Sequence, residues 1–250
     1  MHQPNLYYNQ LQEDVAGLLT GDKDYLAFFC NSGAEANEAA IKIARKASGK
    51  QEIITFQNSF HGRTFGSMSA TGQDKIKQGF GEGVPHFSYA IFNDMDSVKA
   101  LANKETSAIM LELVQGESGV QPADKAFVKA LSDYCQETGI YLIVDEVQTG
   151  IGRTGKLFAY EHYDIEPDIF TLAKGLANGV PVGAMLAKSS LGGAFSYGSH
   201  GSTFGGNKLS MAAAKATLEV MLTPGFLDTA LKMGTSYKLN CKRSCLIKRQ

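Results

Sequence analysis

The sequence predicts an α/β protein with a mostly parallel sheet that is covered by helices on both faces. Short apolar runs alternate with segments of helical periodicity along the 250 residues, which is the pattern of a parallel sheet. The 27 glycines cluster at motif-like sites rather than in a linker, and the chain has no repeats or low-complexity tracts. We therefore expect one compact α/β unit with a sizeable core.

The first half of the chain contains two predicted helices and four predicted strands. A helix over 6–19 is predicted because apolar residues recur at helical spacing, and the segment 20–22 ends it. The apolar run 25–30, YLAFFC, suits a buried strand, and it leads into a helix over 31–47. Further strands are predicted at 52–56, 86–92 and 107–113.

The second half continues this alternation. The segment 124–139 is predicted to be a helix, with Phe127 and Leu131 on its apolar face and Gly139 at its end. Strands are predicted at 140–145, 168–173 and 182–187, and a helix at 209–222.

Composition and charge narrow the class of protein. The chain is 44% hydrophobic and 20% charged, which is ordinary for a soluble globular protein. Its net charge of −1 gives no electrostatic reason to expect nucleic acid or an anionic membrane as a partner. No apolar run is long enough to span a bilayer, and the N-terminus lacks the features of a signal peptide. Cys30 and Cys135 are expected to be reduced core thiols, so we expect a cytoplasmic protein.

Two charged residues stand at the ends of predicted apolar strands. Asp145 ends the strand 140–145, and Lys174 follows the strand 168–173. Ligands of open parallel sheets bind outside the carboxyl ends of the strands. We therefore expect both side chains to point into one crevice.

Lys174 has two interpretations when it is taken alone. A lysine at a strand-to-loop junction can be an ordinary surface residue. At the mouth of a buried sheet, however, its charge is costly, and an amine in a partly desolvated pocket becomes a usable nucleophile near neutral pH. The second interpretation is a lysine that forms a Schiff base.

The motif VDEVQTG over 144–150 supplies an acidic residue that would lie in the same crevice as this amine. Its two adjacent acids could be solubilising residues or metal ligands, but no DxD cluster or histidine pair supports a metal, and the four cysteines show no zinc spacing. An acid opposite a lysine suits pyridoxal phosphate, whose pyridine nitrogen needs a carboxylate to stay protonated. Asp145 is the candidate for this role, and Gln148 could donate a hydrogen bond to the ring hydroxyl.

A phosphate group would need a cradle, and CNSGAEANEAA offers one. It places small residues between a strand and a helix N-terminus, where free N–H groups and the helix dipole favour an anion. The motif is neither GxGxxG nor a P-loop, so nicotinamide and nucleoside-triphosphate sites lose support. A plain N-capped helix is the alternative. GSTFGGN over 201–207 is a second small, hydroxyl-bearing loop.

The segment SFHGRT supplies further candidates after the strand 52–56. Phe60 would provide a surface on which a ring can lie, although ordinary packing is an alternative. Arg63 has a planar fork that suits a substrate carboxylate. His61 could act as an acid or base, but a structural histidine supporting the ring is the safer interpretation.

Together these motifs resemble the class-III pyridoxal-phosphate-dependent aminotransferases of fold type I, and among them the acetylornithine aminotransferases of arginine biosynthesis. The resemblance covers about residues 3–222. Its motifs are NLYYNQLQEDVA, FFCNSGAEANEAAIKIARK, FHGRTFGSMSATGQ, ELVQGESGV, DEVQTGIGRTGKLFAYEH, PDIFTLAKGLANGVPVGAMLA and GSHGSTFGGN.

The resemblance implies a role for each matching residue in binding pyridoxal 5′-phosphate. Lys174 would form the Schiff base and move the proton during transfer. Asp145 would hold the pyridinium nitrogen, and Phe60 would stack on the ring. The remaining implied cofactor contacts are Ser32, Gly33, Ala34, His61, Glu146, Val147 and Gln148.

The resemblance also implies the substrates and a partner. N2-Acetylornithine would donate its amino group to 2-oxoglutarate, giving glutamate, with Arg63 on a substrate carboxylate and Glu117 as a gate between the two substrates. Ser202 and Thr203 would reach the substrate and the phosphate of a neighbouring subunit, which implies a homodimer with shared active sites.

The chain departs from the family pattern at both ends. Family members begin upstream and continue into a C-terminal domain, so we expect 1–222 to be the cofactor-binding large domain and 223–250 a remnant of the connection. The tail 236–250 fits a truncated helix, a disordered end or an altered reading frame. Two alternatives to the acetylornithine assignment are an ornithine or other ω-aminotransferase, and a cofactor-binding dimerisation module without activity.

Overall fold

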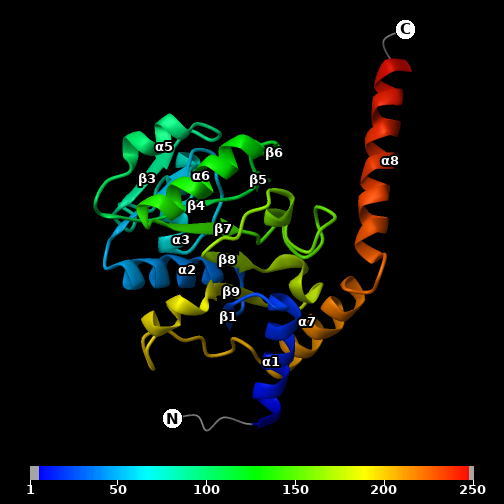
Figure 1. The fold of residues 1–250 in the computed structure, drawn as a ribbon, viewed down its shortest axis with the longest axis horizontal. Coiled ribbons are helices and arrows are strands. Elements are labelled where there is room, and N and C mark those ends of the chain that lie inside the picture. Colours follow the sequence, from blue (N-terminus) through cyan, green and yellow to red (C-terminus); the bar gives the residue numbers. More distant parts are fainter. Residues whose placement is uncertain (1–5, 248–250) are drawn as a thin grey trace.

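The fold is built on one large sheet (Figure 1). The computed structural model describes residues 6–247. The seven strands lie in the order β1 (Tyr25–Cys30), β9 (Gly183–Lys188), β8 (Ile169–Leu172), β7 (Tyr141–Asp145), β4 (Thr106–Leu111), β2 (Glu52–Phe56) and β3 (Phe87–Ala90). All seven predicted strands are therefore present, with ends that shift by a few residues.

The sheet is mostly parallel, as predicted. β2 pairs in parallel with β3 and β4, and β7 pairs in parallel with β4 and β8. β9 runs antiparallel to both of its neighbours, β1 and β8. The carboxyl ends of the other six strands therefore lie along one edge of the sheet, where ligands bind in open sheets.

Helices cover both faces of the sheet, because successive strand residues point to opposite sides. In β4, Ala108 and Met110 pack in one hydrophobic cluster, while Ile109 and Leu111 pack in the other. The first cluster includes residues of α2 (Gly33–Ser48) and α3 (Phe65–Ala70). The second includes residues of α1 (Leu6–Thr20), α5 (Met95–Leu101), α6 (Lys125–Thr138) and α7 (Lys208–Met221).

Helix α2 shows how the sequence sets local structure next to the pocket. Ser32 is its N-cap, with an extended backbone and a hydroxyl that accepts the N–H of Glu35 at 3.2 Å. Gly49 ends the helix in the left-handed conformation, at φ 70°. One face of the helix is a buried stripe of mostly alanine and isoleucine, so α2 can lie close to the sheet.

The remaining elements are short, except for the last helix. α4 (Asp74–Lys77), β5 (Val114–Gln115) and β6 (Gln121–Pro122) lie in connections, as do 3-10 turns at Ala159–His162, Lys174–Ala177 and Ser189–Ala194. α8 (Phe226–Ile247) extends away from the body of the molecule (Figure 1). The structure shows a helix in the tail as far as residue 247, which does not bear on the alternative of an altered reading frame, and 248–250 lie outside the described residues.

Two further findings bear on the sequence predictions. Cys30 and Cys135 are both buried and free, which confirms that they are core thiols. In the part of the chain that the structure describes, no helix has both the length and the hydropathy that crossing a bilayer requires.

Candidate active site

A pocket of about 470 Å³ opens at the carboxyl ends of the strands. It brings Asp145, at the end of β7, together with Lys174, which follows β8, as the strand ends predicted. β7 and β8 are neighbours in the sheet, and Asp145 is in register with Thr171. The pocket is lined by Asn31, Ser32, Gly33, Ala34, Asn37, Phe60, His61, Gly62, Arg63, Glu112, Glu117, Asp145, Val147, Gln148, Ala173, Lys174, Gly179, Val180, Pro181 and Val182.

Asp145 is buried and is held by several hydrogen-bond donors. Its Oδ2 accepts from the Asn37 side chain at 2.8 Å and lies 2.8 Å from Nδ1 of His61. Its Oδ1 accepts the backbone N–H of Val147 at 3.0 Å. The carboxylate is therefore fixed in orientation before any ligand arrives.

His61 lies behind this carboxylate rather than in the open. Its side chain is buried, and its Nδ1 donates to Asp145 because an ionised carboxylate can only accept. Its Nε2 has no hydrogen-bond partner among the described residues. This geometry agrees with the interpretation of His61 as a supporting residue, since its one hydrogen-bonded ring nitrogen points to Asp145.

Lys174 contrasts with Asp145 in its surroundings. Of the two interpretations of Lys174, a surface lysine and a partly desolvated amine, neither is decided by its position: Lys174 lines the pocket but is exposed to solvent. Lys174 begins a 3-10 turn with φ at 41°, a left-handed conformation that is strained for a residue with a Cβ. The amine therefore lies at the mouth of the pocket on a sharply turned backbone.

The N-terminus of α2 forms one wall of the pocket. Ser32, Gly33 and Ala34 all line it, and the first N–H groups of a helix have no acceptor within the helix. A Cβ on Gly33 would lie 2.7 Å from a methyl group of Val147, so glycine lets the helix approach the segment that follows β7 this closely. This wall offers unpaired donors and a positive helix end to an anion.

Phe60 and Arg63 follow β2 and line another side of the pocket. The backbone N–H of Phe60 donates to the Glu112 carboxylate at 2.9 Å. The guanidinium carbon of Arg63 lies 5.7 Å from the centre of the Phe60 ring, and the Arg63 side chain is exposed. An aromatic ring and an exposed cation thus lie next to each other at the pocket, where a ligand can reach them.

Gln148 and Glu117 complete the predicted residues that reach the pocket. A Cβ on Gly116 would collide with the side chain of Gln148, so a glycine at position 116 makes room for that side chain. Glu117, next to this glycine, is exposed at the rim.

Three predicted residues lie elsewhere. Glu146 points into the core, where its carboxylate accepts from the Thr149 hydroxyl at 2.5 Å and from the backbone N–H of Tyr160 at 2.8 Å. Ser202 and Thr203 line a neighbouring cavity of about 410 Å³ that shares only Asn31 with the first pocket. The structure therefore does not bring these three side chains to Asp145 and Lys174.

Sequence reasoning missed two buried polar residues in the pocket, Asn37 and Glu112. Burial raises the pKa of the Glu112 carboxyl to about 7, and the neighbouring Asp145 adds to this rise, while His61 opposes it. Glu112 could have been found in the same way as Asp145, because it is an acidic residue at the carboxyl end of a strand, β4. It was missed because the predicted strand 107–113 included it as a strand residue. Asn37 could have been found as a polar residue in the apolar stripe of α2.

Within residues 6–247, no three histidine, cysteine or acidic side chains gather as metal ligands would.

Comparison with known proteins was made for sequence and for structure. A family model described as Aminotransferase class-III matches residues 3–243. An acetylornithine aminotransferase of Streptococcus mutans serotype c is 76% identical over 229 residues, which are 92% of this chain and 60% of that protein. One from Listeria monocytogenes serotype 4b is 59% identical over 227 residues, or 91% of this chain and 59% of that protein. The chain thus spans about 60% of the length of the curated relatives it matches.

Among solved structures, an ornithine aminotransferase from Toxoplasma gondii superposes with a TM-score of 0.88 at 30% identity. The match covers 97% of this chain and 59% of that one. That crystal structure is described as showing partial occupancy of pyridoxal phosphate at its active site.

Proposed function

Because the chain belongs to the class-III aminotransferase family, we propose that it transfers an amino group from N2-acetylornithine to 2-oxoglutarate, with pyridoxal 5′-phosphate as cofactor. The names of its curated relatives support this choice of substrates, and arginine biosynthesis is the route to which the reaction belongs. The observation that carries the proposal is that Asp145 and Lys174, at the ends of adjacent strands, line the same pocket.

The residues present fit the cofactor, judged by the chemistry of the donor set. A helix N-terminus with free N–H groups suits the phosphate, and Gly33 keeps that wall open beside Val147. Phe60 offers a ring face, and Asp145 offers a buried carboxylate for a protonated nitrogen. Gln148 offers an amide to the ring hydroxyl.

When bound, the cofactor supplies an electron sink for the bond-breaking at the substrate carbon. Asp145 would keep the ring nitrogen protonated, and its carboxylate is already oriented by donors from Asn37, His61 and Val147. Preorganised charge of this kind needs no rearrangement during the reaction, which is the largest single source of catalysis in many enzymes.

Lys174 would hold the cofactor through its Nζ and would later carry a proton to and from the reacting carbon. Its exposure at the mouth of the pocket leaves the side chain free to change partners. General acid–base catalysis by a positioned side chain contributes about 10²–10⁴-fold.

The substrates would be selected at the rim. Arg63 is exposed beside Phe60, and its fork can pair with a carboxylate of 2-oxoglutarate or of the amino donor. Glu117 lies on the same rim, where its charge would favour one substrate over the other.

We further propose a cytoplasmic homodimer. Ser202 and Thr203 lie outside the pocket of their own chain, which agrees with a role in the pocket of a partner. The buried free thiols of Cys30 and Cys135 suit a reducing compartment.

An ornithine or other ω-aminotransferase is the second candidate, because the structure superposes well on an ornithine aminotransferase. A panel of amino donors separates the two. N2-Acetylornithine should give the highest kcat/KM, and ornithine far ahead of it would favour the second candidate.

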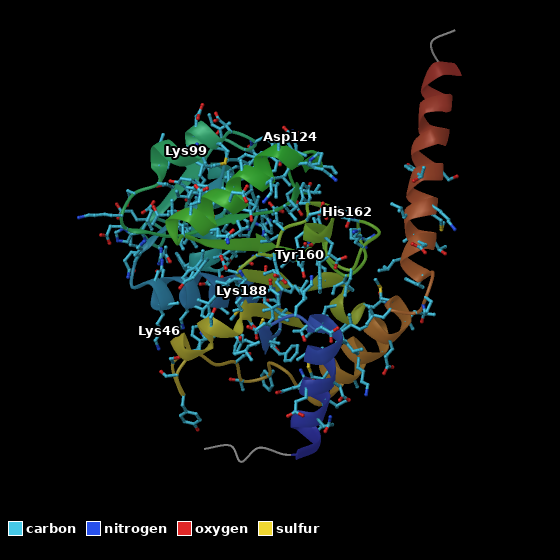
Figure 2. The ribbon with its side chains drawn as sticks, viewed as in Figure 1. Lys46, Lys99, Asp124, Tyr160, His162 and Lys188 are labelled. Atoms are coloured by element: carbon cyan, nitrogen blue, oxygen red, sulfur yellow. The ribbon has the colours of Figure 1, made fainter. Side chains whose placement is uncertain are left out.

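The attachment of the cofactor to Lys174 can be tested by covalent trapping. The chain is mixed with pyridoxal phosphate, reduced with borohydride and digested, and mass spectrometry should find the label on the peptide that contains Lys174. Lys99, exposed on α5 (Figure 2), is a matched control, since Lys99→Ala should leave the label in place. Absence of label, or a label at other lysines only, would reject the proposal, and labelling without turnover of any donor would favour an inactive cofactor-binding module.

A further inference from the structure

Asn37 occupies the centre of a buried hydrogen-bond network beneath the pocket. Its side-chain amide donates to Oδ2 of Asp145 at 2.8 Å and to the backbone carbonyl of His61 at 2.7 Å. Its carbonyl oxygen accepts from the hydroxyl of Thr171 at 2.7 Å. The side chains of Asn37 and Thr171 are both buried.

The partners fix which way the amide of Asn37 points. The backbone carbonyl of His61 and the carboxylate of Asp145 can only accept, so the NH₂ group must face them. The Thr171 hydroxyl is then left to donate to the carbonyl oxygen. The reversed amide would place an oxygen against two acceptors in a dry site, so a single orientation is strongly preferred.

This one side chain ties together four parts of the pocket. Asn37 belongs to α2, whose N-terminus forms the anion-binding wall, and it holds the loop that carries Phe60 and His61. It reaches Asp145 at the end of β7 and Thr171 on β8, three residues before Lys174.

We propose that Asn37 is a positioning residue for the cofactor, acting through Asp145. With His61, it saturates Oδ2 of Asp145. Oδ1 accepts the N–H of Val147 at 3.0 Å and lies 3.5 Å from the Thr171 hydroxyl, whose single proton goes to the nearer oxygen of Asn37, so Oδ1 keeps a lone pair for the ring nitrogen. Thr171 assists by holding the amide of Asn37 in its orientation. This inference rests on the proposed function, since it concerns the same site.

The test compares variants by how tightly they bind pyridoxal phosphate and by the absorption band of the bound cofactor. Asn37→Leu keeps a similar volume but removes a donor to a charged group, so affinity should fall about 10- to 100-fold and the band should shift. Thr171→Val removes the neutral hydrogen bond to Asn37 and the longer 3.5 Å contact with Asp145, so affinity should fall about 2- to 10-fold.

Thr106→Val is the matched control for Thr171→Val. Thr106 is also a buried strand threonine, and its hydroxyl accepts the backbone N–H of Asn103 at 2.9 Å, but it does not line the pocket. Both variants should lose similar thermal stability, and only Thr171→Val should change the cofactor band and affinity.

The outcomes test the role of Asn37 separately from the proposed function. Wild-type affinity and band in a folded Asn37→Leu would overturn the inference. If Asn37→Leu does not fold, equal cofactor affinity in Thr171→Val and Thr106→Val would overturn it instead. Failure of the wild-type chain to bind the cofactor would reject the proposed function itself, which separates the two failures.

Discussion

Asp145 and Glu146 are adjacent acids that belong to two different regions of the molecule. Asp145 lines the pocket, where donors from Asn37 and His61 hold it beside open space. Glu146 points into the core, where its carboxylate accepts from the Thr149 hydroxyl and from the backbone N–H of Tyr160. Both side chains are buried, so burial alone does not identify the acid that faces a ligand.

The difference arises from the alternation of side chains at the end of a strand, which sends neighbours to opposite sides. On the pocket side, hydrogen bonds orient a carboxylate for a partner that comes from outside. On the core side, the donors are part of the fold, and burial raises the pKa of Glu146 to about 7. The predictions below test whether pocket residues govern chemistry and core residues govern stability.

Lys174→Ala should have the largest effect on the pocket side. The amine that holds the cofactor and moves the proton is lost, so the rate of amino transfer should fall by more than about 10⁴-fold. Cofactor affinity should fall less, because the α2 wall and Phe60 remain. Steady-state kinetics and a cofactor titration measure the two effects, and transfer at a near-normal rate would contradict the role of Lys174.

Asp145→Asn should have the next largest effect. The neutral amide keeps the size of the carboxylate but no longer holds a proton on the ring nitrogen, so kcat should fall about 10²–10³-fold. Glu146→Gln, one residue further on, is the control, and its kcat should stay close to that of the wild type. Equal losses in the two variants would remove the distinction between the two regions.

Glu146→Gln should instead change how stability depends on pH. The folded pKa of about 7 lies above the ordinary value of 4.5, so between these values the folded chain keeps a proton that the unfolded chain loses. Stability therefore falls as pH rises through this window, on the order of 3 kcal/mol for this group. Denaturant unfolding at several pH values should show that the free energy of unfolding of the variant depends less on pH than that of the wild type. Part of the pH dependence should remain, because the pKa of Glu112 is raised in the same direction. An unchanged profile would contradict this prediction.

Gly33→Ala should have the smallest effect, at the border of the two regions. The new Cβ would lie 2.7 and 2.9 Å from the two methyl groups of Val147, which should cost about 1–3 kcal/mol of stability and weaken cofactor binding. Gly17→Ala in α1 meets nothing within 4 Å and should stabilise the helix by about 0.5–1 kcal/mol. Thermal melts and cofactor titrations of both variants check this contrast, and equal behaviour would contradict it.

Much of the fold was predictable because buried parallel strands leave long apolar runs. The strand ends then placed Asp145 and Lys174 in one pocket without further information. The reversed direction of β9 was not predictable, because an apolar run does not show which way a strand points. The exposure of Lys174 depends on how the turn after β8 aims its side chain, which no local pattern encodes.

The predicted site was incomplete for a related reason. Asn37 and Glu112 act through contacts with segments far away in the chain, and Asn37 lies among alanines that fit any well-packed helix. Glu146 was assigned to the cofactor because it shares a motif with Asp145, and only the three-dimensional alternation of the strand end separates them.

The left-handed backbone at Lys174 implies a trade-off between activity and durability at this position. A residue with a Cβ costs about 1–2 kcal/mol there, which a glycine would not. A glycine at this position would relieve the strain but would also remove the amine on which the proposed chemistry depends, so a gain in stability here would come with a loss of that chemistry.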